Sequence, residues 1–87
     1  MVVQEQIQEQ IREIIRRLYP NCRIDKTHSK LQLTGPEIRF RARELLYLFF
    51  EIEKAFQIRF SRDDLAGDTF NSVEGISGII AKKLGAN

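Results

Sequence analysis

The 87-residue sequence has few of the features that cross-link a protein or direct it to a membrane. Cys22 is the only cysteine, so no disulfide can form within the chain, as is usual in a reducing compartment. The first ten residues, MVVQEQIQEQ, lack the apolar block of a secretory signal. The longest apolar run, residues 45–50, is far too short to span a membrane. We therefore expect a cytoplasmic protein without a membrane partner.

A large excess of one charge is also absent. Fourteen Lys and Arg face twelve Asp and Glu, so the net charge is +2, which argues against a dedicated nucleic-acid-binding protein. The distribution is uneven, because residues 1–43 hold nine basic and five acidic residues, a balance of +4, whereas residues 44–87 hold five and seven, a balance of −2. A partner would therefore meet a polarised surface.

Helical periodicity dominates what is present. Apolar residues recur at helical spacing over residues 4–19, 42–57 and 72–84, and Ser61 followed by acidic residues predicts a short helical turn that ends at Gly67. A long connection, residues 20–40, joins the first two helices and carries apolar anchors such as Leu33 and Phe40. These patterns predict one domain over residues 1–87, an all-α bundle of three long helices, one short helix and a long first loop.

The apolar positions predict which side of each helix is buried. The first helix buries Ile7, Ile11, Ile14, Ile15 and Leu18, while Glu9–Arg12 and Glu13–Arg17 pair on its solvent face. The second buries Leu45, Leu48, Phe49, Ile52 and Phe56, flanked by Leu46 and Ala55. The last buries Val73, Ile76, Ile80 and Leu84, with Ser72 as its N-cap or Asn71 and Glu74 as a capping box.

A second stripe runs along the opposite side of the second helix. Arg43, Tyr47, Phe50 and Lys54 follow at i, i+4, i+7 and i+11, so the stripe is basic at both ends and aromatic in the middle. Two interpretations remain open. Either Tyr47 and Phe50 pack beneath the long first loop, or they form a partly exposed patch for a partner.

Candidate reactive groups do not assemble into a catalytic or metal site. Cys22, Asp25 and His28 are spaced C-x2-D-x2-H, but a zinc site needs about four ligands and no second pair exists. The acidic residues near Asp63 and Asp64 suit helix capping better than acid–base chemistry. We therefore predict no enzymatic activity, no catalytic residue, no metal and no cofactor.

Two segments resemble acyl carrier proteins. Residues 51–58, EIEKAFQI, are similar to the end of that family's second helix, where acidic residues precede Phe-Gly-Ile, and residues 70–76, FNSVEGI, resemble the entry to its last helix. The resemblance implies the carrier fold over nearly the whole chain. Counting back from Phe56, the family's Asp-Ser-Leu motif falls on Arg41-Ala42-Arg43. Ala42 therefore stands where the family's serine carries phosphopantetheine, and without a hydroxyl no phosphodiester can form there.

A narrower resemblance involves residues 33–36, LTGP, together with residues 45–54. These segments look like the acyl-carrier-related proteins of bacterial peptide maturation systems, which are associated with modified peptides of the bacteriocin type. The resemblance implies a non-catalytic docking protein whose partner is a peptide-modifying enzyme or a leader peptide. The expected partner-binding residues are Arg41, Arg43, Tyr47, Phe50 and Lys54. Because true carriers present an acidic second helix, their usual partners would meet like charges here.

An alternative retains carrier activity. Phosphopantetheine would then be attached at another serine, or a pantetheine thioester would bind non-covalently with Arg39 or Arg41 on its phosphate.

Overall fold

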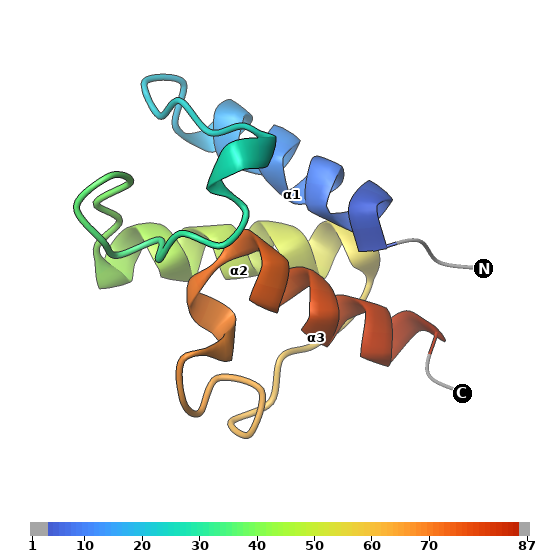
Figure 1. The fold of residues 1–87 in the computed structure, drawn as a ribbon. Helices are drawn as coiled ribbons and strands as arrows, with labels where there is room; N and C mark the ends of the chain where they lie inside the picture. The colour runs from blue at the N-terminus through green and yellow to red at the C-terminus, as the bar shows by residue number, and fades with distance from the viewer. Residues whose placement is uncertain (1–3, 86–87) are drawn as a thin grey trace.

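Helices make up all of the regular structure in the described part of the chain. The computed structural model describes residues 4–85, with only the backbone at Lys26. The elements follow in the order α1 (Gln4–Leu18), η1 (Lys26–His28), α2 (Ala42–Phe56), η2 (Thr69–Asn71) and α3 (Val73–Gly85), where η marks a short 3₁₀-helix (Figure 1). No strand occurs between residues 4 and 85. The prediction of a small all-helical bundle is thus confirmed.

One apolar core is shared by the three α-helices and the first loop. α1 packs against both α2 and α3. The buried apolar residues are Ile7, Ile11, Ile14, Ile15, Ile24, Leu33, Phe40, Leu45, Leu48, Phe49, Ile52, Val73, Ile76 and Ile80. Most of the predicted helical faces are confirmed, but Leu84 near the end of α3 is 41% exposed and Leu46 on α2 is 52% exposed.

The first loop is held by hydrogen bonds to segments far away in the sequence. The N–H of Leu33 donates to the carbonyl of Asn71 at 2.9 Å, and the N–H of Glu74 donates to the carbonyl of Ser29 at 2.9 Å. Leu33 also accepts a hydrogen bond from the N–H of Phe40 at 2.8 Å, which closes residues 33–40 into a compact loop. This loop lies beside the start of α2 (Figure 1).

Tyr19 fastens the end of α1 to the first turn of α2. Its hydroxyl donates to the carbonyl of Glu44 at 3.0 Å, and its ring contacts Phe40 with ring centroids 5.1 Å apart. Burial raises the pKa of the Tyr19 phenol, so the hydroxyl stays a donor at neutral pH. The contact fixes where α2 begins relative to α1.

The expected fourth, short helix is not confirmed. The predicted start is present, since the N–H of Ser61 donates to Asp64 Oδ2 at 2.7 Å and the N–H of Asp64 donates to Ser61 Oγ at 3.2 Å. Beyond it, only two longer i→i+3 hydrogen bonds form, with N–H to O distances of 3.2 and 3.3 Å. Gly67 then takes a φ of +78°, so the turn ends before a helix can propagate.

α3 begins as predicted at Ser72 but without the alternative capping box. Ser72 Oγ accepts a hydrogen bond from the N–H of Gly75 at 2.9 Å, which is the N-cap contact. The Asn71 side chain instead bonds to Thr34, through Oδ1 at 3.2 Å and Nδ2 at 2.9 Å. Gly75 is required because a Cβ there would collide with the carbonyl oxygen of Thr69.

Candidate interaction surface on helix α2

The first residue of α2 is Ala42. The preceding N-cap residue, Arg41, is extended, with φ −97° and ψ 174°, and its N–H donates to Glu44 Oε1 at 2.7 Å. That bond satisfies one of the amides that a helix start leaves without a partner. Ala42 is exposed, so the position that the resemblance assigns to the prosthetic serine presents a methyl group to solvent.

Three exposed arginines surround this helix start. Arg39, Arg41 and Arg43 are all solvent-exposed. Arg39 has a left-handed backbone, with φ 64°, and its Nε donates to the carbonyl of Pro36 at 3.0 Å. Its guanidinium is thereby held against its own loop, whereas Arg43 lies on the outer side of α2.

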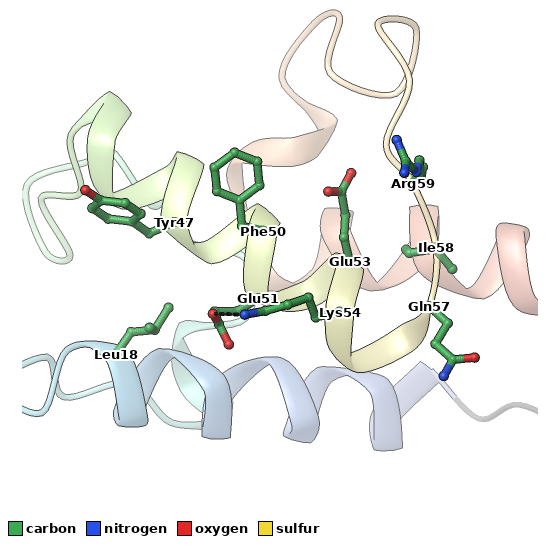
Figure 2. A pocket seen from close by; sticks show the side chains of 9 residues that line it. All are labelled: Leu18, Tyr47, Phe50, Glu51, Glu53, Lys54, Gln57, Ile58 and Arg59. Atoms are coloured by element: carbon green, nitrogen blue, oxygen red, sulfur yellow. Dashed lines mark ion pairs between the residues drawn. The ribbon is translucent and has the colours of Figure 1, made fainter.

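The outer side of α2 carries three large apolar side chains that no other described segment covers. Leu46, Tyr47 and Phe50 are each 52% exposed, so the interpretation that the first loop covers Tyr47 and Phe50 is wrong. We call these three residues the outer patch. Figure 2 shows Tyr47 and Phe50 projecting from successive turns of α2. The alternative interpretation, an exposed patch, describes the geometry.

A shallow groove follows the outer patch along α2. It has a volume of about 760 Å³. Leu18 from the end of α1 forms part of its wall, and Arg59 from the loop after α2 lies at its other end (Figure 2). Its lining residues are Leu18, Tyr47, Phe50, Glu51, Glu53, Lys54, Gln57, Ile58 and Arg59.

The carboxylates around this groove are already engaged. Glu51 pairs with Lys54 at 3.2 Å and with Arg17 at 3.6 Å. Glu53 Oε2 accepts a hydrogen bond from the N–H of Phe60 at 2.9 Å. Within residues 4–85, Arg43 and Arg59 form no ion pair, although both are exposed. Among the described residues, the groove therefore has two unpaired positive charges beside it, Arg43 and Arg59, and one negative charge without an ion pair, Glu53, whose carboxylate is held by a backbone N–H.

The structure brings together three of the five predicted partner-binding residues. Tyr47, Phe50 and Lys54 line the same groove, and Arg43 lies one turn before Tyr47. Arg41 precedes the helix and lies outside the groove lining. Because Lys54 is bound to Glu51, it is not the free cation expected at the C-terminal end of the stripe.

Sequence reasoning missed three residues of this surface. Leu46 precedes Phe50 by one helical turn, so the helical wheel contained a signal for it, although it was assigned to the flank of the core. Leu18 and Arg59 come from other segments. No local pattern places those two side chains beside α2.

The other candidate reactive groups have structural roles. His28 Nδ1 accepts a hydrogen bond from the N–H of Asp25 at 3.0 Å, and Asp25 Oδ1 accepts one from the Thr27 hydroxyl at 2.6 Å. The bond from Thr27 lowers the pKa of the Asp25 carboxyl, and burial raises the pKa of the Cys22 thiol. Across residues 4–85, no three His, Cys, Asp or Glu side chains converge as metal ligands would.

The helices of the described chain are also too short or too polar to cross a bilayer. The fold and the surface together define a small helical bundle with an exposed aromatic face beside unpaired positive charge. Comparison of the chain with protein-family models, with curated proteins and with solved structures gave no match.

Proposed function

We propose that this chain is a non-catalytic docking protein with an acyl-carrier-like fold, acting in a peptide maturation system. Its partner is a peptide-modifying enzyme or the peptide that the enzyme modifies. The observation that carries the proposal is the outer patch, three large apolar side chains left half exposed on a helix whose other side is fully packed. Exposed apolar groups of this kind, gathered on one helix face, are typical of interaction sites.

Two further observations support the carrier-like part of the proposal. Three helices and a long first loop follow in the order that the resemblance implies. α2 starts at Ala42, the position that the resemblance assigns to the prosthetic group. A carrier scaffold that presents a methyl group at this point cannot hold a covalently attached acyl chain.

Binding to the products of neighbouring genes tests the docking role. Each candidate is purified and titrated with this protein by isothermal calorimetry, and the titration is repeated with Phe50→Ala. Ala55→Ser is a suitable control, because Ala55 is exposed on the same helix but outside the groove lining. We expect Phe50→Ala to weaken binding at least tenfold and Ala55→Ser to leave it unchanged. Equal affinity of both variants for every partner would refute the proposed surface.

A mass measurement separates docking from carrier activity. The protein is incubated with coenzyme A and a phosphopantetheinyl transferase of broad specificity, and its intact mass is determined. We expect no mass gain. Ala42→Ser is the informative companion, because it restores a hydroxyl at the first residue of α2. A pantetheine adduct on the unaltered protein would overturn the non-catalytic docking role in favour of a carrier.

A further inference from the structure

We infer that the outer patch binds an acidic, amphipathic helix of about three turns. This inference rests on the proposed docking function and adds the chemistry of the partner. The apolar part of the site is Leu46, Tyr47 and Phe50, and the polar part is the unpaired positive charge of Arg43 and Arg59. The charges and the shape of the site each restrict what fits on it.

The charges favour an acidic partner. Arg43 lies before the aromatic residues along α2, and Arg59 lies beyond them at the far end of the groove (Figure 2 labels Tyr47, Phe50 and Arg59). Glu51 and Glu53, the carboxylates that line the groove, already bind Lys54, Arg17 or the backbone of Phe60. An incoming carboxylate therefore meets an unpaired guanidinium at each end of the apolar patch, where it can form charge-assisted hydrogen bonds.

The shape favours a helix. α2 forms the floor of the groove, and Leu18 of α1 contributes to one side, so the groove runs along a helix axis, with polar residues following Tyr47 and Phe50. Within residues 4–85 there is no strand whose edge an extended peptide could join. From residue 43 to residue 54 the helix rises about 16 Å, at about 1.5 Å per residue. A partner helix of about three turns spans this length, with apolar residues at i, i+3 or i+4, and i+7.

A second copy of this chain fits poorly. If two outer patches met in antiparallel orientation, Arg43 of each copy would face the Arg59 end of the other; in parallel orientation, Arg43 would face Arg43. Like charges would meet either way, which is unfavourable. The exposed apolar area is also small, since three half-exposed large side chains offer about 300 Å², against about 800 Å² per partner in a standard stable interface.

Two synthetic peptides test the inference directly. Both are 18-residue amphipathic helices with the same leucine and phenylalanine positions, but one carries glutamate at every polar site and the other lysine. Fluorescence anisotropy of the labelled peptides measures affinity, and amide chemical shifts of the ¹⁵N-labelled protein locate the site. We expect only the acidic peptide to bind, with shifts concentrated on residues 43–59. Equal binding of the two peptides, or binding of neither, would contradict the inference.

Charge reversal tests the two arginines. The double variant Arg43→Glu, Arg59→Glu should bind the acidic peptide at least tenfold more weakly than the unaltered protein does. Raising the salt concentration from 50 to 500 mM should lower the affinity of the unaltered protein by a similar factor. Lys82→Glu is the control for each reversal, because Lys82 is exposed on α3 and lies against a different groove. If the double variant binds as tightly as the unaltered protein, the arginines do not recognise the peptide.

The same variants distinguish failure of this inference from failure of the proposed function. If Phe50→Ala abolishes the binding of a natural partner but the double arginine reversal does not change it, the docking function is supported. The same result would refute the inference that the partner is acidic. Sedimentation velocity provides a further check. A dimer that forms with concentration and dissociates in Phe50→Ala would make a second copy the occupant and would overturn the inference.

Discussion

Both sides of α2 carry large apolar residues, but the two sides have opposite environments. On the inner side, Leu48 and Ile52 are fully buried and Phe49 is 9% exposed, with its ring 5.3 Å from that of Phe60. On the outer side, Tyr47 and Phe50 are each 52% exposed. The inner side packs against α1 and against the rings of Phe60 and Phe70, whereas the outer side is left half exposed. Apolar character alone therefore does not identify a core, because the number of neighbouring elements decides which side is buried.

The sharpest test of this comparison is a pair of truncations on the same helix. Leu48→Ala should lower the free energy of unfolding by about 2–5 kcal/mol, since it removes a fully buried side chain and leaves a cavity. Phe50→Ala should change the free energy of unfolding by less than about 0.5 kcal/mol, because about half of the Phe50 side chain is already exposed to water. Urea denaturation followed by circular dichroism at 222 nm measures both.

These two variants would contradict the comparison if they behaved alike. A loss above about 2 kcal/mol for Phe50→Ala would mean that the ring is packed in solution as a core residue is. Tyr47→Ala provides an independent check on the same side, and Ile52→Ala on the opposite side. The inference about an acidic helix depends on the outer residues contributing to binding rather than to folding.

The second largest effect concerns arginines rather than apolar residues. Arg12 on α1 is only 2% exposed and donates to Glu9 at 2.9 Å and to Ser29 Oγ at 3.2 Å. Arg12→Ala should destabilise the protein by about 1–3 kcal/mol, because it removes the packing of a buried side chain and its hydrogen bonds to Glu9 and Ser29. Arg43→Ala should change stability by less than about 0.5 kcal/mol.

Thermal unfolding of the two alanine variants, measured side by side, checks this pair. Arg12→Met separates packing from hydrogen bonding, because methionine replaces the aliphatic stem without the guanidinium. If Arg12→Ala and Arg43→Ala have the same melting temperature, the buried arginine does not hold the first loop. The contrast between a stabilising Arg12 and an Arg43 that contributes only to binding would then be lost.

Arg12 also shows how far the sequence could predict this fold. Its pairing with Glu9 followed from the i, i+3 spacing, and the pair forms at 2.9 Å. Its burial was not foreseen, because the residue that covers it, Ser29, lies 17 positions away in the first loop. Periodicity places residues on the faces of one helix, but burial depends on contacts between segments that no local pattern encodes.

The same limit applies to the candidate surface. The stripe containing Tyr47 and Phe50 was predicted from spacing within α2, and both side chains lie on one groove. Spacing alone does not tell whether the first loop covers Tyr47 and Phe50, because that depends on the path of the loop. Asn71 is similar, since its capping role was predicted from Glu74 three residues later, yet its side chain bonds to Thr34 across the molecule.

A smaller effect on stability is expected from substitutions at the C-terminal end of α2. Gln57 is the C-cap and takes a left-handed conformation, with φ 56° and ψ 48°. Glycine adopts this conformation without a steric penalty. Gln57→Gly should therefore raise the free energy of unfolding by about 0.5–1 kcal/mol, whereas Gln57→Ala should give no such gain. Urea titration measures the difference between the two variants, and a less stable glycine variant would contradict the explanation.

The smallest effect is expected at the ion pair between Asp64 and Lys83, whose charged atoms are 2.7 Å apart. This pair ties the loop after α2, which also carries Arg59, to α3. The hydrogen bond from Lys83, with that from the Ser61 backbone, lowers the pKa of the Asp64 carboxyl. Asp64→Asn should cost less than about 1 kcal/mol at pH 7, because the pair is partly exposed.

The pH dependence of that cost identifies its origin. A carboxyl whose pKa is lower in the folded protein stabilises the fold above its unfolded pKa, about 3.9. This contribution is lost as the pH falls through the lower, folded value. The stability difference between Asp64→Asn and the unaltered protein should therefore be present at pH 7 and shrink progressively below about pH 4. Hydrogen exchange should show faster opening in residues 58–68 of the variant and unchanged protection of Leu48 and Ile52 on the inner side of α2. If protection fell equally throughout α2, the outer rim and the inner core would be one cooperative unit, and the contrast between the two sides of the helix would be limited to exposure.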